Sequence, residues 1–320
     1  MKKRMTLTAL CLFLFFGIES YAATPTEVVA VGKAVGIDVQ CSGLMVVGFS
    51  EDSPAKESGL HRGDLIIKVD GEPVETPASL RSMLQEKQQV TLTALRQQRE
   101  QSFLVRPKNA DGFYQIGANV KAEMAGIGTI SYYDPATSVF GALGHGITDV
   151  ASSKLFPIRE GFICKATVMD VERGTSGAPG MLQGAFDSSL VLGSITHNTP
   201  CGIFGTLNRA PDGEEVSVAD RGEITTGDAE ILCNVDGDQV EHYAVKIIRL
   251  YPMDDGTGRN MMLEVTDQRL LERTGGIVQG MSGSPILQNG KLIGAVTHVL
   301  VSDPTTGYGI FIENMLKTAA

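Results

Sequence analysis

The sequence predicts a mainly β protein with two folded units, a small α/β unit followed by an all-β sandwich or pair of barrels. With 320 residues, 42% of them hydrophobic, the chain can bury two modest cores. From about residue 35 to residue 108, strand-like runs alternate with two short helical patterns. From residue 113 onward, short apolar runs alternate with Gly and Asp turns, which is typical of an all-β fold.

Residues 1–22 read as a signal peptide or signal anchor. Lys2, Lys3 and Arg4 precede an apolar run from 5 to 18, and the small residues around Ala22 suit a signal peptidase. The run of roughly 14 residues is short for a membrane-spanning helix. We therefore expect export across the cytoplasmic membrane, with cleavage and retention of the segment both open.

Charge and cysteine content limit the partners and metal sites that we expect. A formal net charge of −10 argues against nucleic acid as the main partner. Four cysteines beyond the first segment form no CxxC pair, so two disulfides and four buried thiols are both open: Cys41, Cys164, Cys201 and Cys233. We expect no structural metal and no cofactor.

The first unit shows strand and helix signals in a regular order. Ser53 is placed to cap a short helix over 53–60, with Pro54 at its first position. A second helical period runs over 79–87, with Leu80 and Leu84 on one side. Strand signals cover 44–49, 63–71, 90–95 and 101–105.

The stretch SPAKESGLHRGDLIIKVDG, residues 53–71, resembles a bacterial PDZ domain almost position for position. The resemblance implies a PDZ domain over 35–108 that binds an extended peptide, either the substrate or the protein's own terminus. By position, the loop for the peptide carboxylate is Val35, Gly36 and Ile37. Leu80 and Leu84 are candidates for lining the groove, and they fit an ordinary core equally well.

Gly, Asp and Asn at 109–112 mark a boundary, after which a second unit runs over 112–320. Turn signals divide it at 126–130, 134–135, 210–213, 236–238 and 289–290. Helical patterns are confined to 267–273 and the last dozen residues. This spacing favours many short strands.

Residues 280–299, GMSGSPILQNGKLIGAVTHV, combine a tight turn with a hairpin. Ser282 lies between Gly280 and Gly283, and the Asn-Gly pair at 289–290 between apolar runs is a strong hairpin signal. This resembles the nucleophile region of chymotrypsin-like serine proteases. The resemblance implies Ser282 as nucleophile and the N–H groups of Gly280 and Ser282 as the oxyanion hole.

By the same resemblance, the strand Thr297, His298 and Val299 borders the substrate. A second GxSGxP pattern surrounds Ser176, but no Asn-Gly hairpin follows it. We therefore interpret Ser176 as part of a structural turn.

A catalytic serine needs a base and an acid. Of five histidines, His145 is the best base, since flanking glycines in GALGHGI allow a close approach. Asp149 and Asp267 are equal candidates for the acid on the residues alone. Asp267 lies between a strand and a helix, so it also fits a helix N-cap.

The segments GALGHGITD, TDQRLLERTGGIVQGMSGSPILQNGKLIGAVTHV and DPTTGYGIFIENML resemble the SpoIVB peptidase family. The resemblance covers nearly the whole chain after the first segment. It implies a chymotrypsin-like double β-barrel protease domain over 112–320, preceded by the PDZ domain. It also implies the triad His145, Asp267 and Ser282, and so favours Asp267 over Asp149 as the acid.

Family membership would imply a signalling serine endopeptidase of endospore formation. Such a protease acts between the forespore and mother-cell membranes and cleaves itself near its N-terminus. Its partner would be a membrane-anchored regulator of an intramembrane protease, whose cleavage triggers late sigma-factor processing. The alternative is a catalytically inactive PDZ-containing adaptor at the forespore membrane, and fluorophosphonate labelling of Ser282 separates the two.

Overall fold

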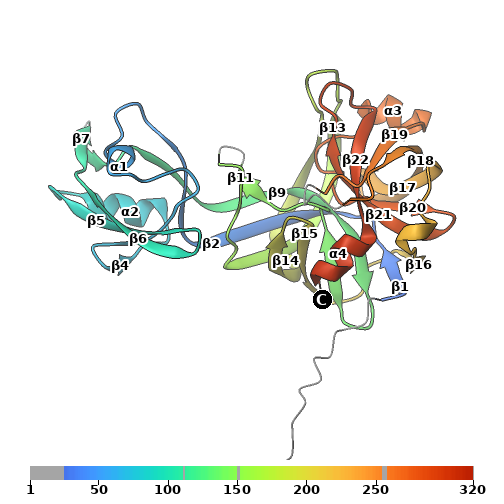
Figure 1. The fold of residues 1–320 in the computed structure, drawn as a ribbon, viewed down its shortest axis with the longest axis horizontal. Helices are drawn as coiled ribbons and strands as arrows, with labels where there is room; N and C mark the ends of the chain where they lie inside the picture. Colours follow the sequence, from blue (N-terminus) through green and yellow to red (C-terminus); the bar gives the residue numbers. More distant parts are fainter. Residues whose placement is uncertain (1–24, 111, 150–151, 254–257, 320) are drawn as a thin grey trace, which may run out of the picture.

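The computed structural model describes residues 25–110, 112–149, 152–253 and 258–319, and strands dominate it (Figure 1). The signal segment expected over 1–22 lies outside these residues. Among the described residues, no helix has both the length and the apolar character needed to cross a membrane.

Six antiparallel strands close into a first barrel. The ring runs β2–β9–β10–β15–β14–β13 and back to β2. Valine, isoleucine and phenylalanine side chains fill its interior, because alternate residues of each strand point inward. The strands are β2 (Ala34–Phe49), β9 (Ala118–Asp134), β10 (Val139–Ala142), β13 (Glu160–Glu172), β14 (Met181–Thr199) and β15 (Gly202–Leu207).

A second ring of six antiparallel strands runs β17–β18–β19–β22–β21–β20 and back to β17. It encloses its own apolar cluster. The strands are β17 (Gly227–Asp236), β18 (Gln239–Leu250), β19 (Met261–Val265), β20 (Pro285–Gln288), β21 (Lys291–Val299) and β22 (Thr306–Phe311). The two rings confirm the predicted double β-barrel.

Three elements join the barrels. β1 (Glu27–Ala30) pairs with β9 and with β16 (Glu214–Val218), and β16 runs parallel to β21. α4 (Ile312–Ala319) packs at the junction (Figure 1). A third apolar cluster draws side chains from both barrels and from this helix, including Tyr132, Phe204, Leu292, Ala295, Met315 and Leu316.

The PDZ unit has its own core and lies to one side of the barrels (Figure 1). Ser53 caps α1, whose first residue is Pro54, and Thr76 and Ser79 form a capping box on α2. Both features agree with the sequence signals. The remaining elements are α1 (Pro54–Glu57), α2 (Pro77–Leu84), β3 (Leu65–Val69), β4 (Glu72–Pro73), β5 (Val90–Arg96), β6 (Arg99–Val105), β7 (Lys108–Ala110) and β8 (Phe113–Gln115).

The predicted start of the PDZ unit at residue 35 is wrong in this structure. Val35, Gly36 and Ile37 pair with β9 and β13 inside the first barrel, where Val35 and Ile37 are buried. They are therefore barrel residues and not a carboxylate-binding loop. Only the second half of β2 enters the PDZ unit, so β2 and β9 connect the two bodies as a pair of continuous strands.

The hairpin and helix signals in the second unit are confirmed, whereas the turn expected at 126–130 is wrong because these residues lie inside β9. Asn289 and Gly290, with φ of 53° and 75°, form the tight turn between β20 and β21. α3 (Gln268–Thr274) and α4 occupy the two segments that showed helical patterns. The elements not yet mentioned are β11 (Thr148–Asp149), β12 (Lys154–Leu155) and the 3₁₀ helix η1 (Arg221–Glu223).

Met315→Ala should destabilise the protein, because Met315 is fully buried at the junction of the barrels and α4. We expect a loss of about 2 to 5 kcal/mol in the free energy of unfolding, measured by urea denaturation. Lys317→Ala on the exposed face of α4 is the control and should change it by less than about 0.5 kcal/mol. Equal effects of the two variants would contradict this packing.

Candidate active site

Ser282 lies on a turn of the second barrel that immediately precedes β20. The turn depends on two glycines with positive φ, Gly280 at 97° and Gly283 at 99°. A Cβ atom on Gly283 would lie 2.0 Å from the backbone oxygen of Thr129 in β9. Glycine is therefore required here both for the turn and for its contact with the first barrel.

Two amide groups of this turn are available to a substrate. Among the hydrogen bonds of the described residues, the N–H groups of Gly280 and Ser282 donate to nothing. The N–H groups of Met281 and Gly283 are both used within the second barrel. The free pair is the one that the sequence assigned to an oxyanion hole.

His145 follows β10 in the first barrel and reaches towards the second. Leu143 and Gly144 have φ of 68° and 67°, which turns the chain sharply before the histidine. A Cβ on Gly144 would lie 2.9 Å from the Cγ2 atom of Thr297 in β21, and one on Gly146 2.2 Å from the side chain of Leu155. The flanking glycines thus give the close approach expected from the sequence.

The His145 ring is set up as a neutral base. Its Nδ1 lies 3.0 Å from the backbone oxygen of Gly146, an acceptor that assigns the proton to Nδ1 and leaves Nε2 with a free lone pair. Burial lowers the pKa of His145 below 6.5, and the bond to Gly146 opposes this only in part. The imidazole therefore remains neutral at pH 7.

Ser282, His145, Gly280 and His298 line one cavity of about 740 Å³ between the barrels. The rings of His145 and His298 are 4.9 Å apart. Burial, with repulsion from His145 and Arg259, lowers the pKa of His298 to about 4. The other lining residues are uncharged and mostly apolar: Ile37, Met124, Ala125, Gly126, Ile127, Leu143, Gly146, Ile147, Thr148, Ser153, Leu155, Pro200 and Gln279.

The Ser282 hydroxyl bonds to Thr297 in this conformation, and the described hydrogen bonds include none from it to His145. Its Oγ donates a hydrogen bond of 2.7 Å to the backbone oxygen of Thr297. The Thr297 side chain is buried and bonds to the backbone oxygens of Gly258 and Tyr308. Of the predicted strand 297–299, only His298 lines the cavity, because neighbouring side chains of a strand point to opposite faces.

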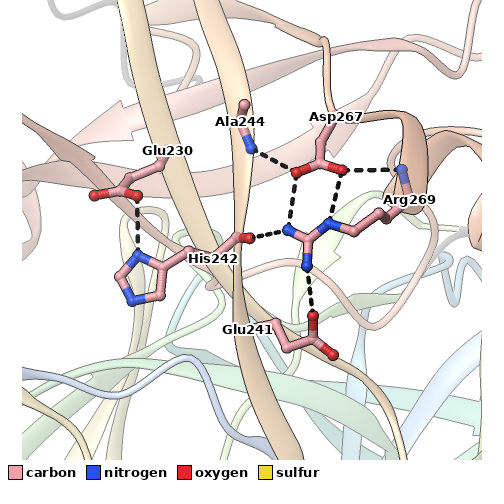
Figure 2. Close-up of polar contacts among 6 residues, drawn as sticks. All are labelled: Glu230, Glu241, His242, Ala244, Asp267 and Arg269. Carbon is pink, nitrogen blue, oxygen red and sulfur yellow. Dashed lines mark hydrogen bonds and ion pairs between the residues drawn. The ribbon is translucent and has the colours of Figure 1, made fainter.

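Asp267 does not contact His145 in the described structure. Its carboxylate caps α3 through the N–H of Arg269, accepts the N–H of Ala244, and receives two bonds from the Arg269 guanidinium (Figure 2). These bonds lower the pKa of Asp267, with the Arg269 side chain the largest cause. It lines a separate depression beside Glu230 and His242.

The contact of Asp267 with His145 that the family resemblance implies is therefore absent, and the N-cap that the sequence also allowed is present. Asp149 contacts no histidine either. Its buried carboxylate accepts the N–H of Ser152 and lies 3.7 Å from the Lys121 ammonium. Within the described residues, no carboxylate orients the His145 ring.

Two positioning residues were missed from the sequence. Asn198, at the end of β14, bonds to both the N–H and the backbone oxygen of Ile147 and to the oxygen of Phe156, and so fixes the chain after His145. Thr129 in β9 bonds to the Ser282 turn. Each residue bonds to a segment more than 40 residues away in the sequence. Neither residue is therefore part of a local sequence motif that could have pointed to it.

The other expected residues take structural positions. Ser176 lies in a turn closed by reciprocal bonds of Thr175 and Ala178, and its hydroxyl donates to Ser302. Leu80 and Leu84 are buried in the PDZ core. No group of three potential metal ligands occurs within the described ranges.

Comparisons with known proteins match both units. A family model described as SpoIVB peptidase S55 matches residues 112–316, and a PDZ model matches residues 45–96. Comparison with curated proteins gives no match.

Among solved structures, the PDZ domain of an SdrC-like protein from Listeria monocytogenes shares 22% identity. The match covers 26% of this chain and 90% of that one, with a TM-score of 0.23. The Rv3671c protease of M. tuberculosis in its inactive form is 14% identical over 62% of this chain and 85% of that one, with a TM-score of 0.36. Its active form is 17% identical over 60% and 71%, with a TM-score of 0.32.

Asp267→Asn distinguishes a structural aspartate from a triad acid. Because Asp267 bonds to α3 and Arg269, we expect the rate of fluorophosphonate labelling of Ser282 to change by less than about threefold in folded protein. A triad acid would instead lower it by about 10⁴-fold. Asp149→Asn is the matched control, and a large loss confined to Asp267→Asn would restore the triad assignment.

The pH dependence of labelling should report His145. Protonation removes the lone pair of the base, so the rate should fall as pH decreases through the lowered pKa of His145. We expect the midpoint of this acid limb below pH 6.5. Circular dichroism over the same range separates this from acid unfolding, and a midpoint at or above pH 6.5 would contradict a desolvated neutral base.

Proposed function

The chain belongs to the SpoIVB peptidase S55 family and is a serine endopeptidase, and we propose that Ser282 and His145 carry its chemistry. The observation that supports this most is their position on one cavity, together with the free N–H groups of Gly280 and Ser282. A nucleophile, a neutral base and two oxyanion donors are the parts that acyl transfer needs.

In the proposed reaction, the Ser282 hydroxyl leaves the oxygen of Thr297 and turns to Nε2 of His145. Its Oγ attacks the peptide carbonyl carbon while His145 accepts the proton. The Gly280 and Ser282 amides then hold the oxyanion, and each such donor contributes about 10²- to 10³-fold in rate. His145 returns the proton to the leaving amine, and water releases the acyl group by the same path.

The cavity supports a preference for apolar substrate residues near the scissile bond. Apart from the two histidines, its lining carries no ionisable side chain, and isoleucine, leucine and methionine are prominent in it. A charged substrate side chain would lose its hydration there without gaining a partner. We therefore propose that an apolar side chain next to the scissile bond occupies it.

We further propose that the protease signals between compartments during endospore formation. Its target would be a membrane-anchored regulator of an intramembrane protease, leading to late sigma-factor processing, with self-cleavage near the N-terminus. The family match and the export signal expected over residues 1–22 support this role. The enzyme would then act between the forespore and mother-cell membranes. The PDZ unit would bind the substrate or the enzyme's own terminus.

Ser282→Ala should abolish cleavage and leave the fold intact, because the hydroxyl makes a single hydrogen bond to the described part of the chain. We expect a loss of about three to six orders of magnitude, measured by sequencing new termini after incubation with candidate membrane regulators. Ser176→Ala, in the similar GTSGAP turn, is the matched control and should cleave normally.

A Ser282→Ala variant with wild-type cleavage would overturn the assignment. Wild-type protein that takes up no fluorophosphonate at Ser282 would favour the inactive adaptor instead.

A further inference from the structure

Thr129 links the two halves of the candidate active site. It lies in β9 of the first barrel and is 1% exposed. Its hydroxyl donates a hydrogen bond of 2.8 Å to the backbone oxygen of Gly280. Its N–H donates one of 3.0 Å to the backbone oxygen of Ser282. Its own backbone oxygen accepts the N–H of Leu143, two residues before His145, at 3.1 Å.

We propose that Thr129 is a positioning residue that sets the oxyanion hole and the placement of Ser282 relative to His145. This inference rests on the proposed function. Nothing in the local sequence singles the residue out, and it touches no reacting atom itself. Its effect is exerted through the backbone of the Ser282 turn.

The hydrogen bonds of the turn show how Thr129 acts. The turn comprises residues 279–282, and each of its four backbone oxygens accepts a hydrogen bond. The oxygens of Gln279 and Met281 accept from the N–H groups of Leu182 and Ser284, respectively. The oxygens of Gly280 and Ser282 both accept from Thr129. Thr129 therefore supplies two of the four anchors. The free N–H groups of Gly280 and Ser282 belong to the peptide groups that Leu182 and Ser284 hold, and Thr129 holds the peptide groups that follow each of them, so the four bonds together fix the directions of both N–H groups.

The anchor matters most at Gly280, because glycine rotates its backbone at little energetic cost. Gly280 has a φ of 97°, and the Thr129 hydroxyl holds the peptide group on its C-terminal side. This peptide group joins the two that carry the Gly280 and Ser282 N–H groups. Without the Thr129 bond it would be held only by the Met281 N–H bond to Val278, and the two free N–H groups would lose their alignment with each other. The lost alignment would weaken oxyanion binding and leave substrate binding largely unchanged.

The same residue fixes the base. Leu143 has the strained φ of 68° that starts the His145 turn, and its N–H is held by Thr129. One residue therefore aligns a turn from each barrel. A misplacement of about 1 Å between catalytic groups costs about 10²-fold in rate.

Thr129→Val tests the proposal in the full-length protein, because valine keeps the shape of the side chain and removes only the hydroxyl. We expect the labelling rate of Ser282 by fluorophosphonate, and kcat on a cleaved peptide, to fall about 10- to 100-fold. KM should change by less than about threefold. Thr129→Ser restores the hydroxyl and should recover most of the rate.

Thr306→Val is the matched control, since Thr306 is also buried and its hydroxyl bonds, among the residues described, only to the carboxylate of Asp303. It should keep the wild-type rate per folded molecule. Thr129→Ala is a second variant in case valine prevents folding, with the folded fraction measured by circular dichroism.

The outcomes separate this inference from the proposed function. If wild-type protein is labelled at Ser282 and folded Thr129→Val is labelled equally fast, the positioning role is overturned and the protease assignment stands. Loss of fold in both the valine and alanine variants would assign the hydroxyl to stability and also overturn it. If wild-type protein is not labelled, the proposed function fails first.

Discussion

The hydrogen bonds between β9 and the Ser282 turn determine whether the two barrels form one catalytic centre. Each barrel has a separate apolar core, and a third apolar cluster holds the pair together. Apolar packing is non-directional, so it gives affinity between the barrels without fixing backbone groups to a fraction of an ångström. The bonds of Thr129 to Gly280, Ser282 and Leu143 supply that direction.

The same strand also carries the PDZ unit. β9 pairs with β2 near the PDZ core at Val120 and Val46, and nine residues later it holds the Ser282 turn at Thr129. Two continuous strands join the bodies where a flexible linker is the usual connection (Figure 1). The orientation of the PDZ unit and the geometry of the catalytic turn are therefore set by one element.

Local signals predicted much of the fold and half of the site. The Asn289-Gly290 hairpin, the Ser53 cap and the glycines around His145 and Ser282 each act within a few residues, so their patterns are visible in the sequence. Pairings between distant segments leave no such local pattern in the sequence. Residues 126–130 show turn signals but lie inside β9, where Gly128 makes room for the Leu143 side chain. Residues 35–37 join a barrel whose other strands begin over 80 residues later.

No carboxylate of the described residues contacts His145, and this bears on the chemistry of the described site. Turning Ser282 from the oxygen of Thr297 to Nε2 of His145 exchanges one neutral hydrogen bond for another, so the net change is small beside the about 1 kcal/mol that one such bond contributes. Charging the half-buried imidazole is harder, because the oxygen of Gly146 stabilises an imidazolium less than a carboxylate does, and His298 adds none of the needed negative charge. Among the described residues the N–H groups of Gly280 and Ser282 are free while the Ser282 hydroxyl bonds to Thr297, so the proposed chemistry needs that hydroxyl to turn and His145 to accept its proton without a change in the turn itself.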